Sequence, residues 1–442
     1  MILVGNGVLI ALDAVGTFIP DGAVVCEGDV VLEVGSTSVL RGKYPGAQFV
    51  DARGGLIMPG MTNVHTHCYS TFARGMALKD ASPKNFTQIL ERLWWRLDQA
   101  LDLEGVYYSA LIHFMDCIKN GTTSVLDHHA SPSAITGSLR TIRRAAEEVG
   151  VRTNLCYEVS DRDGLAKAEE GIAENESYIR ECQAALNPMC TATFGLHASF
   201  TVGEETLKKS ALVSQSLGVG VHLHVAEDLA DVVHCVDNYR MSVVERLQSH
   251  ALLGPQTMAA HCVHISAEER QLLAATGTNA AHNPESNMGN AVGALPLDAM
   301  LAAGVLVGMG TDAYTADMFE GIKVANLLHK FHRRNPGAAW GEVPQLAFTN
   351  NQKIMSRYFA RQVGALTPGA FADIITIDYA PPTPLHAGNY YGHLLFGVSG
   401  GLVSTTIVGG KIRMQQRVLI GLDEKALAAE ARRLAATLWD RF

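Results

Sequence analysis

The middle of the chain alternates short apolar segments with longer segments of helical periodicity. Between residues 57 and 364, runs rich in β-branched residues are each followed by stretches whose apolar residues recur at helical spacing. This alternation predicts strand–helix units. The candidate strands lie at 56–65, 123–129, 151–159, 191–199, 218–225, 257–264, 278–284 and 305–312, with helical segments such as 137–150 and 164–186 between several of them. Eight such units over about 300 residues predict an α/β fold, a (β/α)8 TIM-like barrel.

Short β-prone runs also occupy both ends of the chain. They lie within residues 1–56 and again at 372–379 and 402–420, where glycine-containing turns separate them. Because neither end alone is long enough to bury a sheet, we expect the two ends to pair in one small β-sandwich. The expected domains are a composite β-sandwich at 1–56 plus 365–422, a barrel at 57–364, and a C-terminal helix at 423–442.

Composition restricts the class of protein further. Of the 442 residues, 48% are hydrophobic and 18% charged, so the chain can bury a large core. A net charge of −9 argues against a nucleic-acid-binding or membrane-surface protein, because such proteins carry basic excess. No apolar run is long enough to cross a bilayer, and the first residues are typical of a strand rather than a signal peptide. We therefore expect a cytoplasmic globular protein.

Histidine and carboxylate residues recur at the C-terminal ends of the predicted strands. In a barrel these ends form the rim where catalytic groups gather, because the loops there converge over one mouth. A polar residue can simply cap a strand as it leaves the core, but this does not explain why histidine recurs at most of the ends. The residues concerned are His65, His67, Asp127, His128, His129, Glu158, His197, His224, Glu227, His261, His282 and Asp312.

Part of this series has the spacing of a metal site. His65 and His67 are two apart in a strand, so both imidazoles face one side; the alternative is a structural pair satisfied by backbone hydrogen bonds. His222 and His224 form a second pair, of which His224 lies nearer the strand end. Asp312 follows the eighth strand. Three imidazoles and one carboxylate would hold a divalent cation, zinc or alternatively ferrous iron rather than magnesium or calcium.

Two further residues are candidates for proton transfer. Glu227 follows His224 by three residues, where a carboxylate is suited to move protons between water and substrate. The alternative for Glu227 is a solvated loop acid. His261 ends the sixth strand and is either another ligand or a helper that hydrogen-bonds the developing oxyanion. We favour the helper role.

Six longer motifs resemble a known family. They are GGLIMPGMTNVHTH (54–67), HVAED (224–228), AAHCVH (259–264), HNPESNMG (282–289), GTDAYTADMFEGIK (310–323) and GALTPGAFADIITID (364–378). Together they resemble the amidohydrolase superfamily, and most closely its cytosine-deaminase-like branch, which includes guanine, chlorotriazine and adenosylhomocysteine deaminases. RLWWRLD (92–98) and SVLDHHASP (124–132) are similar to the SsnA-like aminohydrolases within that branch. The resemblance covers essentially the full length.

The resemblance implies a role for each candidate residue. The implied metal ligands are His65, His67, His224 and Asp312; the implied catalytic residues are Glu227, His261 and Asp312; and the implied substrate contacts are His197, His261, Arg74, His129 and Asn287. The two-metal members of the superfamily bridge their ions with a modified lysine on the fourth strand. The fourth predicted strand here, 191–199, contains no lysine, so we expect one metal ion.

The expected reaction follows from the same resemblance. It is the hydrolytic deamination of a purine- or pterin-like nitrogen heterocycle with release of ammonia. Ring opening of a cyclic amide, such as a reduced purine, is an alternative with the same apparatus. A non-catalytic scaffold on this barrel is less favoured, because such relatives would be expected to lose ligands. We expect a small-molecule substrate as the partner, and a homo-oligomer, either a dimer or a larger assembly.

Overall fold

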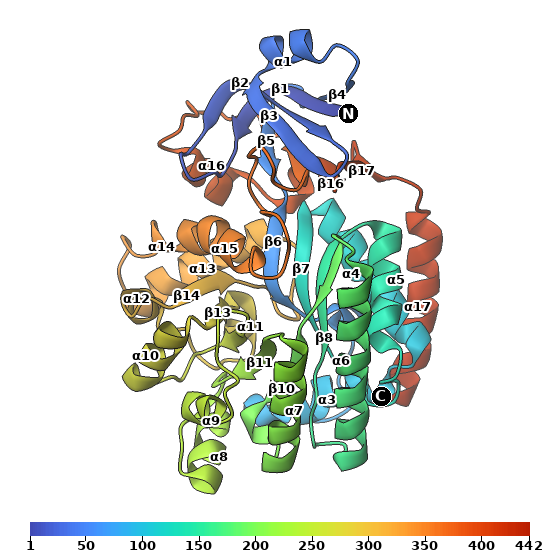
Figure 1. The fold of residues 1–442 in the computed structure, drawn as a ribbon, viewed down its shortest axis with the longest axis vertical. Helices are drawn as coiled ribbons and strands as arrows, with labels where there is room; N and C mark the ends of the chain where they lie inside the picture. The colour runs from blue at the N-terminus through green and yellow to red at the C-terminus, as the bar shows by residue number, and fades with distance from the viewer.

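Two kinds of β structure divide the molecule (Figure 1). In the computed structural model, which describes residues 1–442, parallel strands surrounded by helices carry a smaller β domain at one end. The smaller domain is built from both ends of the chain, drawn in blue and in orange to red. No helix of the protein combines the length and the apolar character that crossing a bilayer requires.

The parallel strands have the arrangement of a TIM-like α/β barrel. They are β6 (Met61–Thr66), β7 (Thr122–His129), β8 (Arg152–Tyr157) and β9 (Cys190–Ala192) in one sheet, and β10 (Phe194–Ala198), β11 (Val221–Val225), β12 (Met258–His261), β13 (Asn279–His282) and β14 (Leu306–Met309) in the other. Single parallel bridges connect the two sheets, one between Val159 and Leu196 and one between Thr66 and Asp312. The first and last strands of the series therefore lie side by side.

Two predicted strands are divided in the structure. The first, 56–65, bends at Gly60, where a Cβ atom would lie 2.2 Å from the side chain of Thr123. Its first half is β5 (Leu56–Pro59), which pairs with the terminal strands, and its second half is β6. The fourth, 191–199, pairs with β8 up to Ala192 and with β11 from Phe194. The change of partner at Thr193 separates β9 from β10.

Helices follow most of the barrel strands, and the predicted segments 137–150 and 164–186 are confirmed as helices α5 and α6. The barrel helices are α4 (Leu103–Lys119), α5 (Ser138–Val149), α6 (Leu165–Ala185), α7 (Glu204–Leu217), α8 (Leu229–Tyr239), α9 (Val243–Ser249), α10 (Ala267–Thr276), α11 (Pro284–Gly289), α12 (Leu297–Ala302), α13 (Met318–Arg333), α14 (Glu342–Pro344) and α15 (Asn351–Met355). Their apolar faces join the strands in one large core.

The two ends of the chain pair with each other, as the sequence predicts, and their strands form one nine-stranded sheet. Its strands are β1 (Ile2–Ile10), β2 (Phe18–Glu27), β3 (Val30–Ser36), β4 (Gln48–Asp51), β5, β15 (Ile374–Ile377), β16 (Val403–Val408), β17 (Lys411–Gln415) and β18 (Val418–Leu419), with α1 (Thr37–Lys43) and α16 (Tyr390–Gly397) beside them. Because β5 lies between β1 and β15, it joins the N-terminal and C-terminal strands. The domain boundaries stay a prediction.

A buried ion pair connects the barrel to this sheet. Arg152 begins β8, at the end of the barrel opposite the candidate site, and its guanidinium donates to both carboxylate oxygens of Asp373 at 3.1 and 3.0 Å. Pro188 O accepts a third hydrogen bond from Arg152, and Gly409 N donates to Asp373 Oδ1 at 2.7 Å. The guanidinium also lies 3.7 Å from the centre of the Phe371 ring.

The segment after β6 covers the mouth of the barrel. It contains α2 (Phe86–Ile89), a π-helical turn at Leu90–Trp94, and α3 (Trp95–Ala100). The last helix, α17 (Glu424–Arg441), packs beside α4, and Trp439 Nε1 donates to Phe72 O at 2.7 Å. α17 thus contacts the chain just after β6.

Candidate active site

The ends of β6 and β14 bring the first and last predicted ligands together. Thr311 N and Asp312 N both donate to His65 O, at 3.0 and 2.9 Å, and Thr66 Oγ1 donates to Asp312 O at 3.0 Å. These bonds fix the backbone on both sides of the seam between the two strands. His65 and Asp312 therefore face the same point at the barrel mouth.

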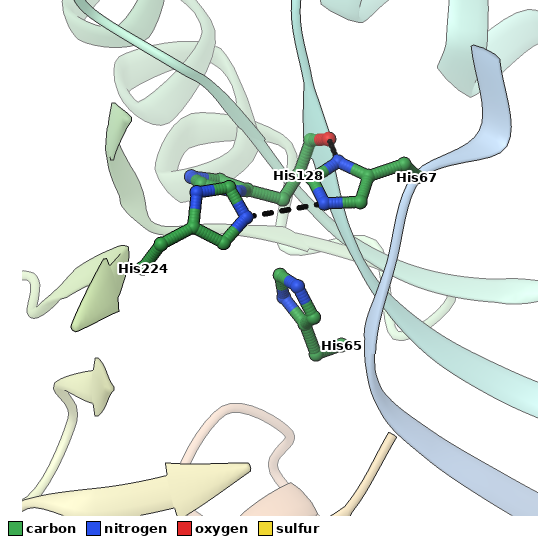
Figure 2. Close-up of side chains that lie close together, drawn as sticks. All are labelled: His65, His67, His128 and His224. Atoms are coloured by element: carbon green, nitrogen blue, oxygen red, sulfur yellow. Dashed lines mark hydrogen bonds between the residues drawn. The ribbon is translucent and has the colours of Figure 1, made fainter. Parts of the chain in front are cut away.

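The four predicted metal ligands converge there. His67 Nε2 lies 3.2 Å from His224 Nε2 and 3.0 Å from Asp312 Oδ1, and His65 Nε2 lies 3.8 Å from the same oxygen. Figure 2 shows the imidazoles of His65, His67 and His224 converging, with His128 behind them. The three imidazoles each offer a nitrogen within 4.8 Å of the others, and Asp312 Oδ1 contacts two of these rings, an arrangement that suits one cation.

The hydrogen bonds behind the histidines leave the correct nitrogens available for a metal. His67 Nδ1 donates to His128 O at 2.5 Å, and His65 Nδ1 lies 2.8 Å from His222 Nε2. In both rings the other nitrogen, Nε2, faces the point where the predicted ligands converge. His65 Nε2 is fully buried there without a hydrogen-bond partner. A buried nitrogen of this kind is costly unless something binds it. Three imidazoles and one carboxylate fit a divalent cation, zinc in particular.

The charge states agree with this interpretation. Burial lowers the pKa of His65 and of His224 well below the usual histidine value, so both rings are neutral, the form that binds metal. Burial also acts to lower the pKa of His67, but Asp312 and Glu158 outweigh it and raise that pKa. Two carboxylates close to one imidazole require a positive charge between them.

Glu227 and His261 lie on the substrate side of this cluster. His261 Nε2 is 3.5 Å from Glu227 Oε2 and 3.5 Å from Asp312 Oδ2, while His261 Nδ1 donates to Asn287 Oδ1 at 2.8 Å. Asn290 Nδ2 donates to Glu227 Oε1 at 3.0 Å. Burial raises the pKa of Glu227, although His261 and Asn290 oppose the change. A carboxyl group with a raised pKa is suited to carry a proton near neutral pH.

The backbone is strained where these side chains begin. His261 has φ 73°, Asp312 has φ 55°, and Ala226, just before Glu227, has φ 46°. Residues other than glycine rarely adopt the left-handed region, and such strain concentrates at functional sites. At three strand ends of this mouth, the side chains are therefore oriented by an unfavourable backbone conformation.

A cavity opens in front of the cluster. Its polar lining comprises His67, His224, Glu227 and Asp312 together with His197, Glu158 and Arg162. Its roof is apolar and comes from the segment that covers the mouth, with Phe200 added: Phe86, Leu90, Trp94, Trp95 and Phe200. Both tryptophans of the RLWWRLD motif line the cavity, where an indole can stack on a planar ring.

The predicted substrate contacts differ in where the structure places them. His197 and His261 lie at the site, as described. Asn287 instead contacts His261, and His129 is buried with its Nε2 2.9 Å from Ser131 Oγ. Arg74 is not brought to this cavity: its side chain is 63% exposed and pairs with Asp116 at 2.9 Å.

Sequence reasoning missed several residues of the site. Glu158 stands in the series of strand-end residues, but its position alone indicates no role, and the spacing of His222 and His224 does not indicate that His222 supports His65. Arg162 and its buried partner Asp98 come from loop and helix segments that carry no motif. The Arg162 guanidinium lies 5.4 Å from the Trp95 ring, so this pair supports the roof as well as the polar lining.

A barrel with a histidine-rich metal centre and an adjacent carboxylic acid at its mouth defines a metal-binding hydrolase. Comparison with known families agrees: the model of the Amidohydrolase family matches residues 56–413. The chain belongs to this family. It is accordingly a hydrolase that acts on carbon–nitrogen bonds other than peptide bonds.

Individual relatives extend over almost the whole chain. A 5'-deoxyadenosine deaminase of Methanosarcina mazei is 32% identical over 99% of this chain and 98% of its own. A 5-methylthioadenosine/S-adenosylhomocysteine deaminase of Pelotomaculum thermopropionicum is 31% identical over 100% and 99%. An adenosine deaminase from Xanthomonas campestris, solved with bound zinc, superposes with a TM-score of 0.88 at 22% identity, covering 99% of this chain and 98% of its own. That last likeness concerns the fold.

Proposed function

We propose that the protein is a deaminase that uses one divalent metal ion, zinc, to replace an amino group of a purine-like nitrogen heterocycle with oxygen, releasing ammonia. The observation that carries this proposal is the convergence of His65, His67, His224 and Asp312, with Glu227 and His261 beside them. The names of the two relatives, both deaminases of adenosine-like compounds, support the reaction class.

The four convergent residues would hold the ion. A bound divalent cation would supply Lewis-acid activation of water at neutral pH. The zinc in the Xanthomonas campestris structure supports the choice of metal. β9 and β10 contain no lysine that could bridge a second ion, which supports a single one.

The remaining chemistry belongs to side chains of this chain. Asp312 Oδ2, 3.5 Å from His261 Nε2, accepts a proton from the attacking water. Glu227, whose raised pKa favours the protonated form, gives its proton to a ring nitrogen. It then takes the proton of the hydroxyl group now bonded to the ring carbon and passes it to the leaving amine, and the proton that Asp312 took from water returns to Glu227. His261, held by Asn287, hydrogen-bonds the oxygen that develops negative charge. Water supplies the atoms gained, so the products are a carbonyl compound and ammonia.

The site is also shaped for a flat, uncharged ring. The indoles of Trp94 and Trp95 form part of an apolar roof, and Arg162 is neutralised by Asp98. Such a roof favours stacking of an aromatic heterocycle. We propose that residues 57–364 provide this site and that the composite domain of residues 1–56 and 365–422 supports it.

The test combines metal analysis with an ammonia-release screen over purines, their nucleosides, pterins and reduced purines. We expect about one equivalent of zinc and ammonia release without ring cleavage. Glu227→Gln should retain the metal and lose turnover at least about 100-fold, whereas Glu205→Gln on exposed α7 should match the wild type. A ring-opened acid as product would refute deamination, and unchanged turnover of Glu227→Gln would refute the role of Glu227.

A further inference from the structure

Glu158 is a buried carboxylate that the proposed chemistry does not use. It directly follows β8, is 3% exposed, and lines the same cavity as Glu227. Its Oε1 lies 3.1 Å from His67 Nδ1 and 3.4 Å from His128 Nδ1, but makes no hydrogen bond of good geometry. Its Oε2 lies 3.8 Å from His197 Nε2. A buried carboxylate with so few donors is costly unless a ligand provides them.

The hydrogen bonds of His197 determine which of its nitrogens carries the proton. Thr201 Oγ1 donates to Ala198 O at 3.1 Å, so this hydroxyl has no proton left for His197 and accepts from His197 Nδ1 at 2.7 Å. The proton is thereby placed on Nδ1. Nδ1 is thus occupied by Thr201, and Nε2 is the ring nitrogen left to face the cavity and accept a hydrogen bond.

His128 does not satisfy Glu158 either. Its Nε2 donates to Leu196 O at 3.0 Å, and its Nδ1, 3.4 Å from Glu158 Oε1, makes no hydrogen bond. The nearby cation Arg162 is engaged with Asp98 and Asp163. Glu158 Oε2 and His197 Nε2 are therefore two hydrogen-bond acceptors that line one cavity without a donor of their own.

We propose that Glu158 and His197 form a paired acceptor that selects the substrate by two hydrogen-bond donors. This inference rests on the proposed deaminase function and specifies its substrate class. The donors are either N–H groups on the edge of the heterocycle or the hydroxyl groups of an attached ribose. Both sources offer hydrogen-bond donors to the two acceptors. The ring nitrogens N1 and N3 of adenine carry no proton and cannot act as such donors.

Distance and charge restrict the donors further. Glu158, His197 and His224 each offer an atom within 4.8 Å of the others, so the donors lie close to the atoms held at the metal centre. The cavity also contains Glu227 and Asp312 and no unpaired basic side chain among its lining residues. A phosphorylated substrate would meet repulsion there, so the selected compounds are uncharged or cationic.

The energetic reason for selection is that a substrate without donors leaves both acceptors buried and unpaired. A site built to hydrogen-bond a substrate group discriminates strongly against analogues that lack it. Replacing one acceptor with a donor of the same size should therefore change selectivity rather than reaction chemistry. Glu158→Gln does this, because the amide has nearly the shape of the carboxylate but carries an N–H donor in place of one acceptor oxygen.

The experiment uses the metal-loaded enzyme and two matched substrate pairs. Adenine against 2,6-diaminopurine tests N–H donors, and adenosine against 2',3'-dideoxyadenosine tests ribose hydroxyls. The wild type should prefer the donor-bearing member of one pair by at least about tenfold in kcat/KM. Glu158→Gln should reduce that preference roughly 10- to 100-fold, mainly through KM, with unchanged metal content. The pair that responds identifies the source of the donors.

A second variant tests the position of the proton on His197 and leaves Glu158 unchanged. Thr201→Val removes the acceptor that holds the His197 proton on Nδ1, so it should weaken the same preference. Glu169→Gln, an exposed change on α6, is the control. The paired acceptor is refuted if Glu158→Gln and Thr201→Val both turn over substrate with the kcat/KM ratios of the wild type in both substrate pairs. It is also refuted if the only effect of Glu158→Gln is loss of metal.

Calorimetric titration of the same four compounds separates this inference from the proposed function. If none releases ammonia but Glu158→Gln still abolishes the difference in affinity within one pair, deamination fails and the paired acceptor stands. If ammonia is released with equal preference by wild type and variant, only the paired acceptor fails. If no compound binds, both fail.

Discussion

The two ends of the barrel both bury charged groups but satisfy them in opposite ways. At the end opposite the candidate site, here called the floor, both carboxylate oxygens of Asp373 accept from Arg152, Gly409 N donates to Asp373 as well, and the guanidinium lies over the Phe371 ring. At the mouth, buried polar atoms of His65 and Glu158 lack hydrogen-bond partners, and backbones at strand ends adopt positive φ.

The difference indicates which buried charges serve the fold and which serve a ligand. A satisfied pair holds two parts of the chain together and needs nothing else. Unsatisfied groups reduce stability and persist where binding restores their interactions. Substitutions at the floor should therefore act on stability, and substitutions at the mouth on metal content and activity.

The largest effect is expected at the mouth, from Asp312→Asn. It removes the only carboxylate among the four ligands and the acceptor of the water proton, so activity should fall by roughly 1,000-fold or more and metal content should fall with it. Urea unfolding in the presence of a chelator should show a metal-free protein no less stable than the wild type. A destabilised metal-free variant would contradict the division between the two ends.

The next largest effect is expected at the floor, on the free energy of unfolding. Arg152→Met leaves Asp373 buried without its cation and should lower the free energy of unfolding by about 3–5 kcal/mol. Urea unfolding followed by circular dichroism measures the loss. Below the unfolding transition, kcat and KM should stay within about twofold of the wild type. The double variant Arg152→Met with Asp373→Leu should recover part of the stability, because no unpaired charge remains.

A smaller effect is expected behind the metal ligands. His222→Gln disturbs the contact of His222 Nε2 with His65 Nδ1 at 2.8 Å, which orients the His65 ring. Loss of such support typically costs 10- to 100-fold in metal affinity, about 1.4–2.7 kcal/mol. Competition with a zinc chelator measures it, and His234→Gln on α8 serves as the control. Equal affinity in wild type and His222→Gln would show that the contact does not orient His65.

The smallest effect is expected on the pH dependence of stability and comes from one carboxyl group, that of Glu285. Burial, with Glu320 and Asp317 nearby, raises the pKa of Glu285 to about 8. In the folded state it keeps its proton up to that pH, whereas the unfolded chain releases it above about 4.3, so its contribution to stability falls as pH rises from 4.5 to 8. Glu285→Gln should be more stable than wild type by about 1 kcal/mol at pH 8, after allowance for solvent screening, and equal at pH 4. Unfolding midpoints at both pH values decide this.

Much of the fold could be predicted because its signals are local. Alternating strands and helices follow from hydrophobic periodicity, and the pairing of the two chain ends follows from their inability to bury a sheet alone. The division of two predicted strands could not be predicted in this way. At Gly60 it depends on the side chain of Thr123 opposite, and at Thr193 on a change of neighbouring strand.

The residues of the candidate site divide in the same way: local signals predict some of them, and others depend on contacts between distant segments. His65, His67, His224 and Asp312 stand at strand ends, where position along the chain predicts position in space. Arg74 lies in a loop whose path the periodicity does not describe, and its side chain pairs with Asp116 instead. The tautomer of His197 depends on a backbone carbonyl, which no residue pattern can indicate.

The seam where β6 meets β14 has a consequence for how the enzyme is made. A ribosome completes His65 and His67 early, but Asp312 emerges only after nearly all of the barrel has been synthesised. Nascent or truncated chains can offer the paired imidazoles alone, and so bind the cation weakly or in the wrong geometry. The proposed metal site is therefore complete only once β14 lies beside β6.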